Sequence, residues 1–297
     1  MSSAPPTNEL ALSLPPPERP ELPEGVEPTP LRPRWKPTGV LIAFALGLAG
    51  TLLGALVIGV VAVAFGADAG NLPPGVNILL TVAQDAAFVG AALFVAGTVA
   101  RPAPWQFGLS GTRVGPFAGW VVVAFVAFAV FGQLYSALVD IGPQEKLPDE
   151  LGADGSAVAL VAAAFLVTVV APIAEELFFR GFVFGALRTW RGTWLAAVLT
   201  GLLFGAIHLG SAPDVLYLPI LAVFGFVLCL LYAKTGSLYP CIALHAINNC
   251  VAFAGTRDGW DWQVAVLLAG SLGSVAAFGL LVRRLSARPP ALARGAW

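Results

Sequence analysis

The chain has 297 residues, of which 58% are hydrophobic and only 11% are charged, and its mean hydropathy is +0.83. This balance excludes an ordinary soluble globular domain and is typical of a polytopic membrane protein. The formal net charge of −1 gives no indication of a nucleic-acid partner. The three cysteines, Cys229, Cys241 and Cys250, lie in apolar runs without CxxC spacing. We expect them to be reduced, small hydrophobic side chains.

The first 37 residues are rich in proline and show no apolar periodicity. We predict that this segment is a disordered cytoplasmic tail with polyproline II character. It has no positive region followed by an apolar region, which argues against a cleavable signal. A PxxP pattern at Pro17–Pro20 could bind a partner, but a solvated tail is the preferred interpretation.

Eight stretches after the tail approach or exceed the roughly 20 apolar residues that a membrane-spanning helix needs. In chain order they are 39–66, 77–100, 117–139, 156–184, 194–209, 215–233, 238–255 and 262–282. The fourth is long, and a proline inside it, Pro172, is expected to kink it. The sequence therefore predicts an all-α fold, a polytopic membrane helical bundle of about eight transmembrane helices.

The positions of the basic residues predict the orientation of these helices, because Lys and Arg concentrate on the cytoplasmic side. With the N-terminus inside, all but three of the 16 Lys and Arg residues fall in the cytoplasm or its loops. Of the three, Lys146 and Arg257 fall outside and Arg180 lies within a span. We therefore expect a multi-pass protein of the cell membrane with both termini cytoplasmic and an acidic outer loop at 140–154.

Ionisable side chains inside the predicted spans are few, and each is costly in lipid, so they mark the candidate site. They are Asp85, Glu175, Glu176, Arg180, His208 and His245, which include both histidines of the chain. Glu176 and Arg180 are four residues apart, so they share a helix face and can form a structural pair. Glu175 points about 100° away from Glu176 and has no partner at helical spacing. Asp85 lacks a comparable partner, and we interpret it as packing polarity.

Two further helices each carry a histidine with a neighbour on the same face. His208 lies four residues after Phe204, and His245 lies four residues before Asn249. For one intramembrane histidine, hydrogen bonding between helices is a sufficient explanation. Two imidazoles, an amide and the unpaired Glu175 on three helices form a set that can activate water and stabilise an oxyanion.

The polar residues fall into three short motifs. The segments EELFFR (175–180), FGAIH (204–208) and HAINN (245–249) resemble the EExxxR, FxxxH and HxxxN motifs of the CPBP intramembrane proteases. That family includes type II CAAX prenyl endopeptidases, bacteriocin-processing proteins and lysostaphin resistance protein A-like proteins. Each motif alone is weak, but three in order on apolar helices are a strong combination. The resemblance covers about residues 156–255 and implies a four-helix catalytic core.

The resemblance implies an intramembrane endopeptidase, of glutamic or metallo type, that hydrolyses membrane-associated or CAAX-type substrates. The implied roles are water activation by Glu175 with His208, oxyanion stabilisation by His245 and Asn249, and support of the site by Glu176 and Arg180. The implied partners are a membrane peptide or protein and the lipid bilayer, without nucleic acid. The oligomeric state is not predicted.

The cofactor is left open by the sequence. If a metal is used, His208, His245 and Glu175 would make a plausible zinc set with an open position. A metal-free Glu–His pair would use the same residues, so their spacing does not decide between the two. Cys241 is interpreted as a small hydrophobic side chain rather than as a further ligand.

The predicted organisation has four parts. They are the tail (1–37), the first three helices with the acidic loop (38–155), the protease core (156–255), and the last helix with a basic cytoplasmic tail (256–297). Two other functions stay open. One is a non-proteolytic bacteriocin-immunity or membrane scaffold protein on the same fold. The other, less favoured, is a cation transporter, for which no inverted repeat or pair of broken helices is visible.

Overall fold

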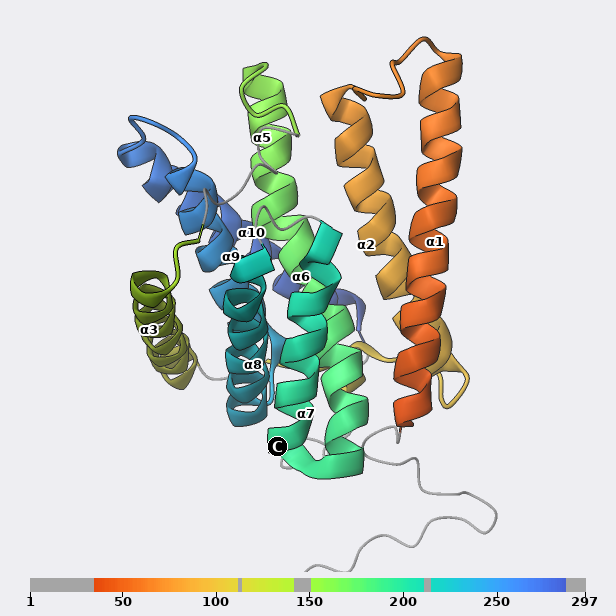
Figure 1. Ribbon diagram of the computed structural model, residues 1–297. Coiled ribbons are helices and arrows are strands. Elements are labelled where there is room, and N and C mark those ends of the chain that lie inside the picture. The colour runs from red at the N-terminus through yellow and green to blue at the C-terminus, as the bar shows by residue number, and fades with distance from the viewer. Residues whose placement is uncertain (1–34, 112–113, 142–150, 211–214, 287–297) are drawn as a thin grey trace, which may run out of the picture. The chain divides into compact units, whose positions relative to one another are not determined.

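The computed structural model describes residues 35–111, 114–141, 151–210 and 215–286. Within these ranges the chain is helical and contains no strand beyond one isolated bridge (Figure 1). The prediction of an all-α fold is therefore confirmed. The expectations for the Pro-rich tail (1–37) and its PxxP pattern fall outside the described part except at residues 35–37. There the prediction of disorder is wrong, because Trp35 is buried against Phe107 and Phe182 and the first helix begins at Pro37.

The helices follow one another along the chain with short connections. They are α1 (Pro37–Ala64), α2 (Pro74–Gly97), the 3-10 helix η2 (Pro104–Phe107), α3 (Val114–Leu138), α5 (Ala157–Phe165), the π-helix η3 (Leu166–Val170), α6 (Ala171–Glu176), the π-helix η4 (Leu177–Phe184), α7 (Gly185–Ile207), the 3-10 helices η5 (His208–Gly210) and η6 (Val215–Tyr217), α8 (Leu218–Thr235), α9 (Leu238–Gly255) and α10 (Trp262–Leu285). Most bounds lie within about three residues of the predicted spans.

A reversal at Gly192 separates the fourth and fifth predicted spans. Seven helices in the described ranges are long and apolar enough to cross a membrane, and one of them, Ala157–Ile207, has 51 residues. Gly192 has φ 78° and ψ 177°, a conformation outside the helical region that glycine adopts without steric penalty. In Figure 1 the chain runs down through η4 and back up along α7. The 51-residue run thus holds two segments, 157–191 and 193–207, which agrees with about eight crossings.

Labelling of introduced cysteines tests this reversal. With the turn at Gly192, five crossings separate Gly155 from Ser286, and without it only four do. We expect Gly155→Cys and Ser286→Cys to react with a membrane-impermeant maleimide from opposite sides of the membrane. The native cysteines are buried, so the parent protein serves as a low-background control. Labelling of both positions from the same side would contradict the reversal.

The fourth span is irregular around Pro172, where a kink was expected. The N–H of Ala171 donates to the carbonyl of Leu166, five residues earlier, which is the π-helical pattern. Continuing that pattern, the carbonyl of Val167 would need an N–H from Pro172, which has none. The side chain of Asn249 supplies the donor instead, with Nδ2 2.9 Å from the Val167 oxygen. The irregularity is therefore a π-helical stretch stabilised from α9.

Two pairs of neighbours dominate the packing, since α1 lies along α2 and α7 lies along α8. Gly201 and Gly205 allow the close approach of α7 to α8. A Cβ atom at Gly201 would lie 2.5 Å from the Ala222 oxygen, and one at Gly205 would lie 2.9 Å from the Leu218 oxygen. This approach fixes the end of α7, which carries the first histidine, beside the start of α8.

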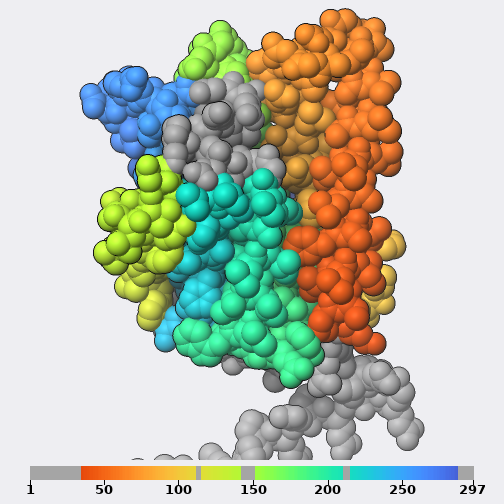
Figure 2. Space-filling model, in the orientation of Figure 1, coloured from red at the N-terminus to blue at the C-terminus, as the bar shows by residue number. Residues whose placement is uncertain are grey.

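The faces of α1, α3 and α10 that point away from the other helices carry large exposed apolar side chains. They include Leu41, Leu52 and Leu56 of α1, Leu134 and Leu138 of α3, and Leu280 and Leu281 of α10. Figure 2 shows α1 forming one flank of the surface in that view. Such faces suit contact with lipid acyl chains and fit a multi-pass membrane protein.

Candidate active site

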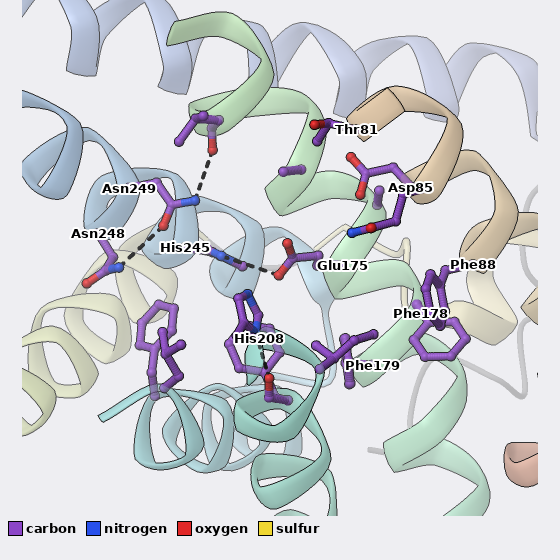
Figure 3. A pocket seen from close by; sticks show the side chains of 18 of the residues that line it. Thr81, Asp85, Phe88, Glu175, Phe178, Phe179, His208, His245, Asn248 and Asn249 are labelled. Atoms are coloured by element: carbon purple, nitrogen blue, oxygen red, sulfur yellow. Dashed lines mark hydrogen bonds and ion pairs between the residues drawn. The ribbon is translucent and has the colours of Figure 1, made fainter. Parts of the chain in front are cut away.

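A cavity of about 260 Å³ lies among α2, α6, α7, α8 and α9. Four of the residues predicted from the three motifs line it, namely Glu175, His208, His245 and Asn249 (Figure 3). They come from α6, from the end of α7 and from α9, so the structure brings three separate parts of the chain together. The remaining walls are mostly apolar, with several aromatic rings, and also include a few polar side chains from α2 and α9.

Glu176 and Arg180 lie behind the cavity and are fully buried. Arg180 Nη1 donates to Glu176 Oε1 at 2.8 Å, which is the pair that the helical spacing indicates. The other terminal nitrogen, Nη2, donates to the carbonyl of Gly225 on α8 at 3.1 Å. The guanidinium group also lies over the ring of Phe204, 4.6 Å from its centroid. The pair is therefore held from α7 and α8.

Glu176 has a second partner that spacing alone does not indicate. His245 Nδ1 lies 2.8 Å from Glu176 Oε1. A carboxylate paired with a guanidinium accepts hydrogen bonds, so Nδ1 carries the proton and donates it. The opposite nitrogen, Nε2, is directed toward Glu175 and lies 3.8 Å from its Oε2. Glu176 thus sets both the tautomer and the orientation of His245.

Glu175 is the more accessible of the two adjacent glutamates, with 24% of its side chain exposed. The 3.8 Å between its Oε2 and His245 Nε2 is longer than a hydrogen bond. One oxygen atom beside both groups could lie within hydrogen-bonding distance of each. This is a suitable position for a reacting water molecule or for a substrate carbonyl.

His208 is the first residue after α7, which ends at Ile207. The sequence predicted it inside the span 194–209, so the predicted helix end is wrong by a residue or two. Its Nδ1 is 2.7 Å from the Phe204 carbonyl oxygen. A carbonyl can only accept, so Nδ1 carries the proton, and the neutral ring has its lone pair on Nε2. The FxxxH spacing therefore has a structural meaning, because one helical turn joins this histidine to the Phe204 backbone.

Asn249 has a structural role that the sequence did not show. Besides the bond from Nδ2 to Val167, its Oδ1 accepts a hydrogen bond from Asn248 Nδ2 at 3.3 Å. An amide nitrogen has two hydrogens. One is used on the backbone of η3, and the other has no acceptor among the described residues.

Asp85 also lines the cavity, which its interpretation as packing polarity does not explain. It comes from α2, outside the three motifs, and only 8% of it is exposed. Its presence in an otherwise apolar span was the signal available in the sequence. The other wall residues that the motifs leave out include Thr81, Gln84, Phe178, Phe179 and Phe224.

The metal site considered from the sequence is not supported by the side-chain arrangement. Within the described residues, no group of three or more His, Cys, Asp or Glu side chains is placed to hold a metal ion. His208, His245 and Glu175 share the cavity without forming such a group. Cys241 is fully buried, and its thiol lies 3.4 Å from the Leu228 carbonyl oxygen, which agrees with a small packing residue.

Part of the chain, including the three motifs, matches a known family model. Residues 157–251 match the family described as "Type II CAAX prenyl endopeptidase Rce1-like". This segment resembles that family. This confirms the resemblance predicted from the three motifs, and the matched segment contains every motif residue. Asp85 lies outside it.

Curated relatives of this Rce1-like segment are bacterial. A Bacillus subtilis (strain 168) protein named "Putative membrane peptidase YdiL" is 32% identical over 82 residues, covering 28% of this chain and 32% of the relative. The "Uncharacterized protein YyaK" of the same organism is 35% identical over 96 residues, covering 30% of the chain and 32% of the relative. An "Uncharacterized 24.3 kDa protein" of Escherichia coli is 27% identical over 147 residues, covering 48% of the chain and 64% of the relative.

The chain therefore spans about a third of the length of the two Bacillus proteins and just under two thirds of the Escherichia coli protein. No solved structure matches the chain.

Proposed function

We propose that the protein is an intramembrane endopeptidase that hydrolyses membrane-associated or CAAX-type substrates with a water molecule activated by Glu175 and His208. The observation that carries this proposal is the meeting of Glu175, His208, His245 and Asn249 in one cavity of an Rce1-like core. Around this small volume the Glu175 carboxylate is the base and the His208 imidazole is a hydrogen-bond acceptor. The His245 imidazole and the Asn249 amide are hydrogen-bond donors.

The first step requires a base and a means of holding the water. Glu175 takes one proton from water, and His208 Nε2 accepts a hydrogen bond from the other hydrogen. The water oxygen then bonds to the peptide carbonyl carbon, and the carbonyl π-electrons move to the oxygen. The product of this step is a tetrahedral oxyanion with a protonated Glu175.

The second step stabilises the oxyanion and releases the products. In this proposal His245 enters the step with a second proton, taken up from water, on Nε2 and donates that Nε2–H to the oxyanion, while its Nδ1–H stays on the Glu176 carboxylate. The second Nδ2 hydrogen of Asn249 is the other donor. Glu175 returns its proton to the leaving nitrogen, the C–N bond breaks, and a carboxylic acid and an amine result.

Cleavage of defined membrane peptides tests the proposal directly. The purified protein in detergent would be incubated with a membrane peptide library and, separately, with a prenylated CaaX peptide, in water enriched in heavy oxygen. We expect internal cleavage, with one heavy oxygen in the new carboxyl group. If neither substrate is cut, the proposal is contradicted and a non-proteolytic binding role is favoured.

The orientation is part of the proposal, because the distribution of Lys and Arg supports a cell-membrane protein with both termini in the cytoplasm. The side of the membrane from which Ser286→Cys is labelled decides this point. Labelling from the outside would contradict a cytoplasmic C-terminus.

A further inference from the structure

We propose that Asp85 on α2 forms, with the aromatic wall beside it, a subsite for a positively charged substrate group. The group would be a Lys or Arg side chain close to the scissile bond. This inference rests on the proposed protease function and adds to it a substrate preference set by a residue outside the Rce1-like segment.

The first observation is an unpaired buried carboxyl group. Asp85 is 8% exposed and lines the cavity. Its Oδ2 is buried and has no hydrogen-bond partner among the described residues. A carboxylate that is buried without a partner is costly, most of all within a membrane, so a residue of this kind indicates a partner supplied from elsewhere.

The second observation is the charge around Asp85. The ionisable group that acts on it across the cavity is Glu175, also an acid, and Figure 3 shows Asp85 extending toward that side of the cavity. Glu176 is already neutralised, because Arg180 and His245 both bond to it. Among the described residues that line the cavity there is no Lys or Arg. Glu175 has His245 Nε2 beside it at 3.8 Å, so Asp85 is the carboxyl group that faces a space to which a substrate could bring a compensating cation.

The third observation is the aromatic wall on the same side. Phe88 lies one turn after Asp85 on α2, and its ring meets that of Phe178 edge to face, with 4.9 Å between centroids. Both rings line the cavity. Aromatic faces attract cations and also pack against the methylene stem of a long basic side chain. A carboxylate beside such rings is suited to Lys or Arg rather than to a short polar group.

Matched peptides test the subsite. A cleaved membrane peptide would be made with lysine or with norleucine at each position flanking the scissile bond. For the wild-type protein we expect kcat/KM to be about tenfold higher with lysine at one of these positions. In Asp85→Asn, which keeps the shape, the ratio should fall toward one. In Asp85→Lys, the preference should shift to glutamate at that position. Asp68→Asn removes an exposed carboxylate from the α1–α2 connection and is the control.

A binding measurement separates failure of the subsite from failure of the protease. Affinities of the lysine and norleucine peptides would be measured on the wild-type protein and on Glu175→Gln. Cleavage without a lysine preference overturns the subsite and keeps the protease. A lysine preference in binding without any cleavage keeps the subsite and overturns the protease. A preference that is unchanged in Asp85→Asn also overturns the subsite.

Discussion

Glu175→Gln is expected to lose cleavage by about 10²–10⁴-fold, the usual contribution of a general base. Glutamine keeps the shape of the side chain and removes its ability to take a proton from water. The protein should still fold and insert, because His245 Nε2 lies 3.8 Å from Glu175 Oε2, beyond hydrogen-bonding distance, and Oε2 has no hydrogen-bond partner among the described residues. Turnover of a membrane peptide and thermal stability in the same detergent would be measured together.

The contrast between loss of turnover and unchanged stability is the informative result. Near-normal turnover in Glu175→Gln would remove Glu175 from the role of base, whatever the stability of the variant. An equal loss of both quantities would show that Glu175 supports the fold instead.

Glu176→Gln is expected to act mainly on stability. The change leaves Arg180 buried with a weaker partner, and breaking one side of a buried ion pair costs about 3–5 kcal/mol. The double variant Glu176→Gln with Arg180→Met should recover part of this loss, because no unpaired charge remains. Its activity should stay low, because His245 Nδ1 has lost the carboxylate that orients it.

Denaturant titration in mixed micelles gives the free energy of unfolding for the two variants and for Arg180→Met alone. Peptide cleavage is measured at a temperature where all remain folded. If the double variant is no more stable than Glu176→Gln, the unpaired charge is not the cause of the instability. If it recovers activity in full, Glu176 does not orient His245.

The two adjacent glutamates show which contacts could be predicted from the sequence and which could not. Helical geometry was sufficient to assign different roles to the two glutamates, because residues four apart on a helix lie on the same face and only Glu176 is four residues from Arg180. That arithmetic identified the pair of Glu176 with Arg180. It could not identify the bond between Glu176 and His245, which joins residues 69 positions apart on two helices. The motifs indicated that these residues act together, but their contacts depend on how the helices pack.

Asp85 illustrates the same limit for a residue outside the motifs. The sequence shows one acid in an apolar helix and, at helical spacing, nothing of opposite charge beside it. Its neighbours in the cavity wall come from segments about 90 residues later, such as Phe178. Only the packing of α2 against α6 and η4 makes Asp85 part of the site.

The backbone irregularities were only partly predictable. Pro172 indicates that a regular helix cannot continue, but not which form the irregularity takes. The π-helical form depends on a donor from α9, which tertiary structure supplies. The gap between the predicted spans 156–184 and 194–209 was visible in the sequence, whereas the turn at Gly192 with its positive φ is a property of the folded chain.

The hydrogen bond from Asn249 to Val167 has a consequence for the timing of the proposed reaction. The two hydrogens of a carboxamide lie in one plane about 120° apart, so fixing one on a backbone oxygen also fixes the direction of the other. The missing N–H of Pro172 therefore leaves a carbonyl that anchors the Asn249 amide at the cavity wall, and in the proposed mechanism this would order the second donor before any substrate arrives. A donor held in this way has no rotation to complete while negative charge builds on the carbonyl oxygen, and that charge meets an environment that is already ordered.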